Sequence, residues 1–194
     1  MTSSSTRDHL LAVGLQQMRS NGYTATGVKE ILDLAGVPKG SFYHYFPSKE
    51  AFTEEVVARY NTAEKQRLQA ILANPEQAPL HRLRTYFESF IPIYQGFNFG
   101  GGCLLGNLSL EMADQSPRLQ SLLSDSFSGW QQGIAAALRE AADRGELPTA
   151  LNPDDLADYL LNSWEGALVR MKAEKSAQPL HNFLDLTFNI LLKK

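Results

Sequence analysis

The chain has 194 residues, a net charge of −3 and 43% hydrophobic residues, values typical of a globular protein with one or two domains. No apolar run approaches the roughly 18–20 residues of a membrane-spanning helix, and the N-terminus lacks the pattern of a secretory signal. The single cysteine excludes an intramolecular disulfide, and no Cys/His cluster has zinc spacing. We therefore expect a cytoplasmic protein that uses no metal and no cofactor.

The first fifty residues predict three short helices. The first ends at Asn21-Gly22, a helix stop, and the second begins after Thr26, which we expect to be its N-cap. The third is very short, covers residues 39–45, and follows Pro38 at a position where proline is tolerated. Two short helices joined by a tight turn at Gly36 have the size and spacing of a helix-turn-helix.

The remaining residues also follow the helical period, and no segment predicts a strand. A fourth, long helix is expected over residues 48–72, with Ser48 as its cap. Further helices are predicted to begin at about residue 80, to cover residues 103–113, and then to form a long helix that ends at Gly145. Two more cover residues 154–172 and 180–192. Pro92 should kink or shorten the helix that begins at about residue 80. The fold class is thus all-α with about nine helices. A DNA-binding domain covers 1–47, and a larger regulatory and dimerisation domain covers 48–194.

The third predicted helix carries the strongest chemical signal in the chain. Phe42 and Phe46 are four residues apart and should face the core, which leaves Tyr43 and His44 pointing outward. Exposed aromatic and imidazole groups on so short a helix favour insertion into the major groove of DNA. Lys49 and Thr26 stand at helix N-termini, where a phosphate can be bound. The first fifty residues contain five basic and four acidic side chains, so the charge adds little to this argument.

The segment GYTATGVKEILDLAGVPKGSFYHYFPSKEAF resembles the DNA-binding segment of the TetR family of bacterial transcriptional repressors, and the likeness covers about residues 7–60. The resemblance implies a three-helix head, a helical body that binds ligands and dimerises, and no enzymatic activity. It also implies double-stranded operator DNA as a partner. The residues it nominates for DNA contact are Thr26, Lys39, Gly40, Ser41, Tyr43, His44 and Lys49.

The last two predicted helices are the expected homodimer contact. Gly166 and Ala167 permit close helix approach, and the segment FLDLTFNILL is apolar on more than one face. The body is also rich in aromatic residues, which in this family line a pocket for an inducer. The candidates for such a pocket are Phe90, Tyr94, Phe99, Trp130 and Trp164.

Cys103 follows three glycines and should open a short helix. The dipole and open N–H groups of a helix N-terminus stabilise a thiolate, and glycines leave it accessible. The segment GGCLLGNLSLEMAD resembles the subgroup of TetR-type repressors that senses electrophiles and reactive chlorine. That resemblance implies Cys103 as the sensing thiol. The segment ALVRMKAEKSAQPL resembles the same subgroup, which implies Lys172 as a candidate basic partner. The competing interpretation is a cysteine that serves only as a small core residue.

Three functions remain open on the sequence alone. The first is a homodimeric repressor released from DNA when Cys103 is modified by electrophiles or oxidants. The second keeps the repressor but makes induction non-covalent, by an apolar or aromatic small molecule. The third, a thiol-dependent enzyme, is the least favoured, because no histidine shows a recognisable pairing with Cys103.

Overall fold

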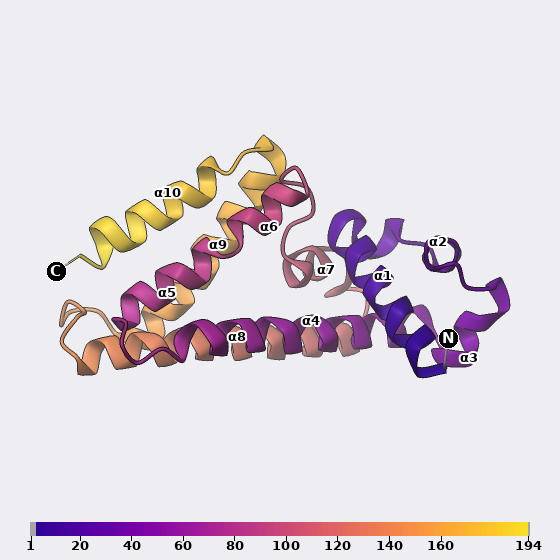
Figure 1. Cartoon of the computed structure of the whole chain (residues 1–194), viewed down its shortest axis with the longest axis horizontal. Helices are drawn as coiled ribbons and strands as arrows, with labels where there is room; N and C mark the ends of the chain where they lie inside the picture. The colour runs from indigo at the N-terminus through magenta and orange to yellow at the C-terminus, as the bar shows by residue number, and fades with distance from the viewer. Residues whose placement is uncertain (1–2, 194) are drawn as a thin grey trace. The chain divides into compact units, whose positions relative to one another are not determined.

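A computed structural model of the chain describes residues 3–193. These residues form helices and connecting turns, with no strand among them, which confirms the all-α prediction (Figure 1). The fold divides into two compact units, Met1–Ala63 with Cys103–Ser126 and Glu64–Gly102 with Phe127–Lys194. Within residues 3–193, no helix combines the length and the apolar character needed to cross a lipid bilayer.

The first unit begins with the predicted helix-turn-helix. Helix α1 covers Ser3–Ala25 and α2 covers Val28–Ala35. A 3₁₀ turn at Lys39–Ser41 then leads into α3, Phe42–Tyr45. Gly36 ends α2 in the left-handed conformation, with a φ of 63°, as its place in the turn requires.

The stop predicted at Asn21-Gly22 is confirmed as a break in α1, with φ 84° and ψ −176° at Gly22, and one further turn follows it to Ala25. One expectation about these helices is wrong. The N-cap of α2 is Gly27 rather than Thr26. No side chain caps α2, and the hydroxyl of Thr26 donates to the carbonyl of Gly22 at 2.6 Å.

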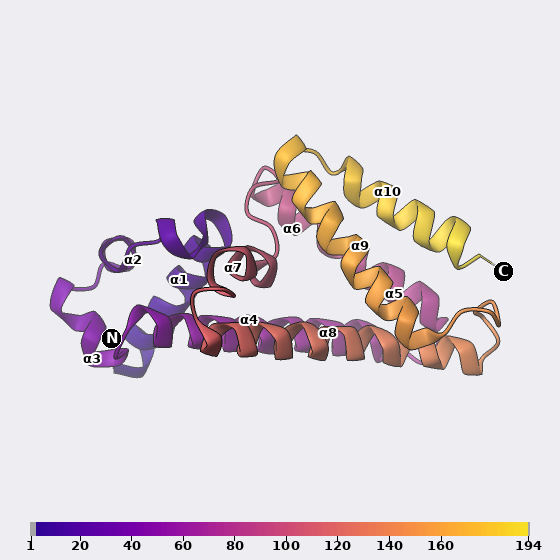
Figure 2. The ribbon, with the colours of Figure 1, turned by 180° about the vertical axis from the view of Figure 1, so that it is seen from behind.

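Three more helices contribute to the first unit: α4 (Lys49–Leu72), α7 (Leu104–Met112) and α8 (Pro117–Asp143). Ser48 caps α4 as predicted, since its Oγ accepts from the N–H of Ala51 at 3.0 Å. Helix α7 lies beside α1 (Figure 2). Residues 103–126 therefore pack with the helix-turn-helix, so the division by packing falls elsewhere than the predicted functional division between residues 47 and 48.

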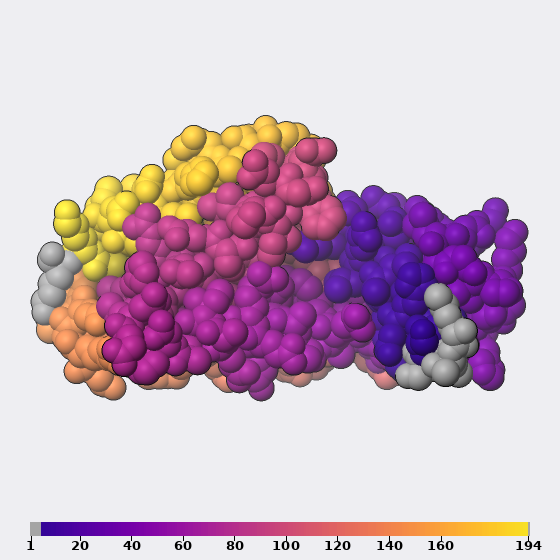
Figure 3. Space-filling model, viewed as in Figure 1, coloured from indigo at the N-terminus to yellow at the C-terminus, as the bar shows by residue number. Residues whose placement is uncertain are grey.

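The second unit contains the remaining parts of α4 and α8 together with α5 (Pro79–Glu88), α6 (Ile91–Gly96), α9 (Pro153–Glu174) and α10 (Gln178–Leu186). The helix predicted from residue 80 is thus two helices, because Pro92 is tolerated only in the first turn of a new one. A π-helical turn, Thr187–Leu191, continues α10. Helix α10 lies against α9 and at the surface of this unit (Figure 3).

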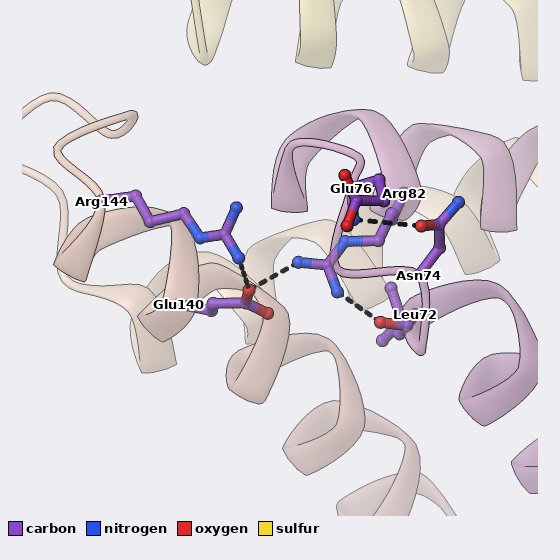
Figure 4. Close-up of polar contacts among 6 residues, drawn as sticks. All are labelled: Leu72, Asn74, Glu76, Arg82, Glu140 and Arg144. Atoms are coloured by element: carbon purple, nitrogen blue, oxygen red, sulfur yellow. Dashed lines mark hydrogen bonds and ion pairs between the residues drawn. The ribbon is translucent and has the colours of Figure 1, made fainter.

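One buried arginine ties three elements of the second unit together (Figure 4). Arg82 of α5 is 4% exposed. Its guanidinium donates to the carbonyl of Leu72 at the end of α4 and, at 2.6 Å, to Glu140 of α8. Arg144 donates to the same carboxylate at 2.7 Å. Because the last carbonyls of a helix lack partners within it, Arg82 caps α4 while neutralising Glu140.

Candidate nucleic-acid interface and thiol site

The third helix is held by aromatic packing on its inner side. Phe42 and Phe46 are fully buried, and their ring centroids lie 5.2 and 4.8 Å from that of Phe52 on α4. A four-residue helix cannot be stable on its own, since nucleation costs more than so few hydrogen bonds return. These three rings therefore fix the orientation of the segment Lys39–Tyr45, which we call the recognition segment.

The outer side of the recognition segment faces solvent. Tyr43 is 68% exposed, and Lys39, Gly40 and His44 are exposed as well, while Ser41 is partly buried. A Cβ added at Gly40 would meet no atom within 4 Å, so the backbone there is open to close approach. The predicted inward and outward orientations are confirmed. Contact of these residues with DNA remains a prediction.

The two predicted phosphate contacts outside this segment are engaged within the protein. Thr26 is fully buried, and its hydroxyl proton is donated to Gly22. Lys49 Nζ donates to the carbonyl of Tyr23 at 2.5 Å and lies 4.0 Å from the centre of its ring. Partial burial lowers the pKa of Lys49, and the nearby charge of Glu111 opposes that shift. Both side chains support the end of α1 in this conformation.

Cys103 is the N-cap of α7, with φ −71° and ψ 130°. Its Sγ lies 3.8 Å from the hydroxyl oxygen of Tyr60 on α4. Gly101 and Gly102 precede it with φ values of 73° and 134°, which only glycine adopts without strain. The thiol is 3% exposed, so the expectation that glycines leave it accessible is wrong. The glycines are required by backbone conformation, and the chain still covers the sulfur.

Lys172, the predicted partner of Cys103, lies in the last turn of α9 and is partly buried. It belongs to the second unit, whereas Cys103 belongs to the first. The pairing of the two side chains remains a prediction.

Four of the five predicted pocket residues form one aromatic cluster in the second unit. The ring of Phe90 is its centre, with centroid distances of 6.3 Å to Tyr94, 6.4 Å to Trp130 and 5.8 Å to Trp164. The fifth residue, Phe99, lies on the loop before Cys103, is partly exposed and has a positive φ of 54°.

Sequence reasoning missed two residues of α7, Asn107 and Glu111. Both contact the end of α1, through hydrogen bonds to backbone atoms of Arg19, Tyr23 and Thr24. The available signal was a polar pair spaced four residues apart on a mostly apolar helix.

An N-terminal helix-turn-helix whose polar face is exposed, followed by a larger helical unit with an aromatic core, defines a one-component DNA-binding regulator. The family model for bacterial regulatory proteins of the tetR family matches residues 10–56, and that for the tetracyclin repressor-like C-terminal domain matches residues 79–186. The chain belongs to the TetR family and is a DNA-binding transcriptional repressor.

Individual relatives agree along nearly the whole chain. The HTH-type transcriptional repressor DhaR of Mycobacterium sp. (strain GP1) is 35% identical over 99% of this chain and 95% of its own length. The reduced form of Escherichia coli NemR has a TM-score of 0.87 at 35% identity, covering 96% of this chain and 97% of its own. A regulatory protein TetR from Rhodobacter sphaeroides has a TM-score of 0.88 at 38% identity, and the match covers 93% of this chain and 95% of that protein's chain.

Proposed function

We propose that the protein is a homodimeric repressor that leaves its operator when Cys103 is modified by an electrophile or an oxidant. The observation that carries this proposal is the place of the thiol. Cys103 is the residue at the N-terminal end of α7, and α7 packs on α1 within the same compact unit as the helix-turn-helix. A change at the sulfur therefore acts on the helix that supports the DNA-reading element. The relative NemR, described in a reduced form, supports a thiol-based signal.

The burial of Cys103 determines how it reacts. With an alkylating agent such as a maleimide, the thiolate sulfur adds to one alkene carbon, and a proton from water is taken up at the other. A sulfur that is 3% exposed can react only when the first turn of α7 opens. The adduct then occupies volume next to Tyr60, so α7 cannot return to its original position.

The recognition segment is the proposed DNA-reading surface. Lys39, Ser41, Tyr43 and His44 supply the hydrogen-bonding groups, and Gly40 permits close approach to the backbone of the duplex. Thr26 and Lys49 are retained as candidate contacts. In this conformation both side chains bond to backbone carbonyls at the end of α1, so contact with a phosphate would require them to exchange those partners.

Exposed apolar side chains on the last two helices support the predicted dimer contact. Tyr159 and Val169 of α9 are 57% and 62% exposed, and Leu186 and Ile190 at the C-terminal end are 60% and 67% exposed. Regulators of this family bind operator DNA and typically dimerise. A second copy of the chain would remove this apolar surface from water. Sedimentation of a Val169→Glu variant should then show a smaller species than the wild-type protein.

A gel shift on the DNA flanking the protein's own gene tests the proposal. We expect the reduced wild-type protein to bind this duplex and N-ethylmaleimide to release it. The Cys103→Ser variant should bind equally well and stay bound in the presence of the reagent. Release of that variant by the same reagent would disprove sensing through Cys103.

Non-covalent induction is the second candidate, and one observation favours it. The indole N–H of Trp164 is buried in the aromatic cluster and has no acceptor among the described residues. An aromatic ligand with a hydrogen-bond acceptor would satisfy this donor. Induction that reverses on dilution and persists in Cys103→Ser would support this second mechanism over the first.

A further inference from the structure

The break in α1 at Gly22 changes where the neighbouring backbone groups find partners. In an uninterrupted helix the N–H groups of Tyr23 and Thr24 would bond to the carbonyls of residues 19 and 20. Gly22 instead has φ 84° and ψ −176°, a conformation essentially restricted to glycine. A break of this kind produces a new helix end with orphan donors and acceptors.

Two side chains of α7 bond to these groups. Glu111 accepts from the N–H of Tyr23 with Oε1, at 3.0 Å, and from the N–H of Thr24 with Oε2, at 2.7 Å. Asn107 donates from Nδ2 to the carbonyl of Arg19, at 3.0 Å. Glu111 thus acts as an N-cap supplied by another helix, and the negative charge is favourable there. We call Asn107, Glu111 and the broken turn at Gly22 the α1 clamp.

The backbone at Gly22 leaves room for the carboxylate of Glu111. A Cβ at Gly22 would overlap Oε1 of Glu111, so glycine is needed both for its φ and for the approach of the carboxylate. Lys49 donates to the carbonyl of Tyr23 and attracts Glu111 electrostatically, which brings the start of α4 into the same cluster. The turn that leads into α2 is therefore held from α7 and from α4.

The clamp also lies along the helix from the thiol. The N–H of Asn107 donates to the carbonyl of Cys103 at 3.0 Å, and Glu111 follows Asn107 by four residues on the same stripe of α7. Any displacement of the first turn of α7 therefore moves the groups that hold α1.

We propose that Asn107 and Glu111 are positioning residues that couple α7 to the helix-turn-helix. The intact clamp fixes the turn before α2 in the position that binds DNA. When the clamp is lost, the recognition segment stays folded, but its position relative to α7 is no longer fixed. The link from the clamp to Cys103 rests on the proposed function, whereas the role of the clamp in DNA binding stands without it.

The test compares Glu111→Gln and Asn107→Ala with Asp114→Asn, a control that removes one negative charge at an exposed position just after α7. Hydrogen exchange at the amides of Tyr23 and Thr24 should accelerate about tenfold or more in the Glu111 variant, and the thermal unfolding midpoint should move little. Affinity for the DNA flanking the gene should fall about tenfold. Asp114→Asn should leave both measurements unchanged.

The same variants separate the clamp from the thiol mechanism. In the wild-type protein, N-ethylmaleimide should weaken DNA binding strongly, and in Glu111→Gln the ratio of affinities with and without the reagent should approach one. Wild-type exchange rates and wild-type DNA affinity in both clamp variants would overturn the clamp. A wild-type protein that ignores the reagent would instead overturn sensing through Cys103 and leave the exchange and affinity tests of the clamp valid.

Discussion

The hydrogen bonds from α7 to the end of α1 in the first unit differ in kind from the aromatic core of the second unit. In the second unit, Phe87 is fully buried among aromatic rings, with centroid distances of 5.0 Å to both Trp164 and Phe183. In the first unit, α7 holds α1 through hydrogen bonds to a broken turn, made by side chains that are only partly buried. Burial of an aromatic ring contributes about 3–5 kcal/mol to the free energy of unfolding and resists local opening. A partly hydrated hydrogen bond contributes about 1 kcal/mol. The difference places the adjustable contact next to the DNA-reading element.

Removal of a core ring should have the largest effect on stability. Phe87→Ala deletes a fully buried ring of the second unit and should lower the free energy of unfolding by about 4 kcal/mol, measured by denaturant titration. Phe97→Ala is the matched control, since that ring is 42% exposed and its loss should cost less than about 1 kcal/mol. Equal losses in the two variants would contradict the account of the second unit.

The buried arginine is a polar contact of the second unit that we expect to approach this scale. Arg82→Ala leaves the carbonyl of Leu72 without its cap and Glu140 without its buried partner. We expect a loss of about 2–3 kcal/mol, below the range for fully buried pairs because the Glu140 side chain is 39% exposed. Arg84→Ala removes a surface pair with Glu88 and an exposed hydrogen bond to Asn189, and should change stability by about 1 kcal/mol or less. A loss in Arg84→Ala as large as that in Arg82→Ala would remove the distinction between them.

A glycine comparison tests the break in α1. Gly22→Ala forces a strained φ and displaces Glu111, so it should cost about 2 kcal/mol and weaken DNA binding as well. Gly129→Ala lies in α8, where an added Cβ meets no atom within 4 Å, and should stabilise the protein by about 0.5–1 kcal/mol. Both variants replace glycine by alanine. A difference between them in thermal unfolding or in a gel shift therefore reports the backbone conformation and surroundings of Gly22, and not the added methyl group itself. Unchanged DNA binding in Gly22→Ala would count against the clamp.

The smallest expected effect is a pH dependence of the clamp. Partial burial raises the pKa of Glu111, but the N–H groups of Thr24 and Tyr23 and the charge of Lys49 outweigh it and hold the pKa below its ordinary value. A carboxyl of this kind contributes stability that is present above its unfolded-state pKa and is lost as the pH falls through the lower folded-state pKa. The stability difference between wild-type and Glu111→Gln should therefore shrink as the pH is lowered from about 6 to about 3. A difference that is constant over this range would show that the charge of Glu111 does not matter.

Local patterns in the sequence predicted much of the fold. Four-residue spacing gave the burial of Phe42 and Phe46 and the exposure of Tyr43, and Ser48 was identified as a cap. These features depend on residues within one turn of each other. Pro92 was expected to kink or shorten the helix that begins near residue 80, and that helix is in fact short, because proline lacks the N–H that a helix interior needs and lies instead in the first turn of α6.

The rest depended on contacts between distant segments. Glu111 binds backbone N–H groups 87 and 88 residues earlier, and backbone partners leave no signature in side-chain pattern. The burial of Cys103 likewise comes from its packing beside Tyr60 on α4, although three glycines precede it. Thr26 was assigned as a cap from residue type alone, and the break at Gly22 redirected its hydroxyl.

The central claim is that Cys103 communicates with the helix-turn-helix through the end of α1. Its most direct test is hydrogen exchange at the amides of Tyr23 and Thr24 before and after alkylation with N-ethylmaleimide, in the wild-type protein and in Cys103→Ser. We expect faster exchange at these two amides only when Cys103 is present and alkylated. Unchanged exchange in a fully alkylated wild-type protein that has nevertheless released its DNA would contradict the central claim.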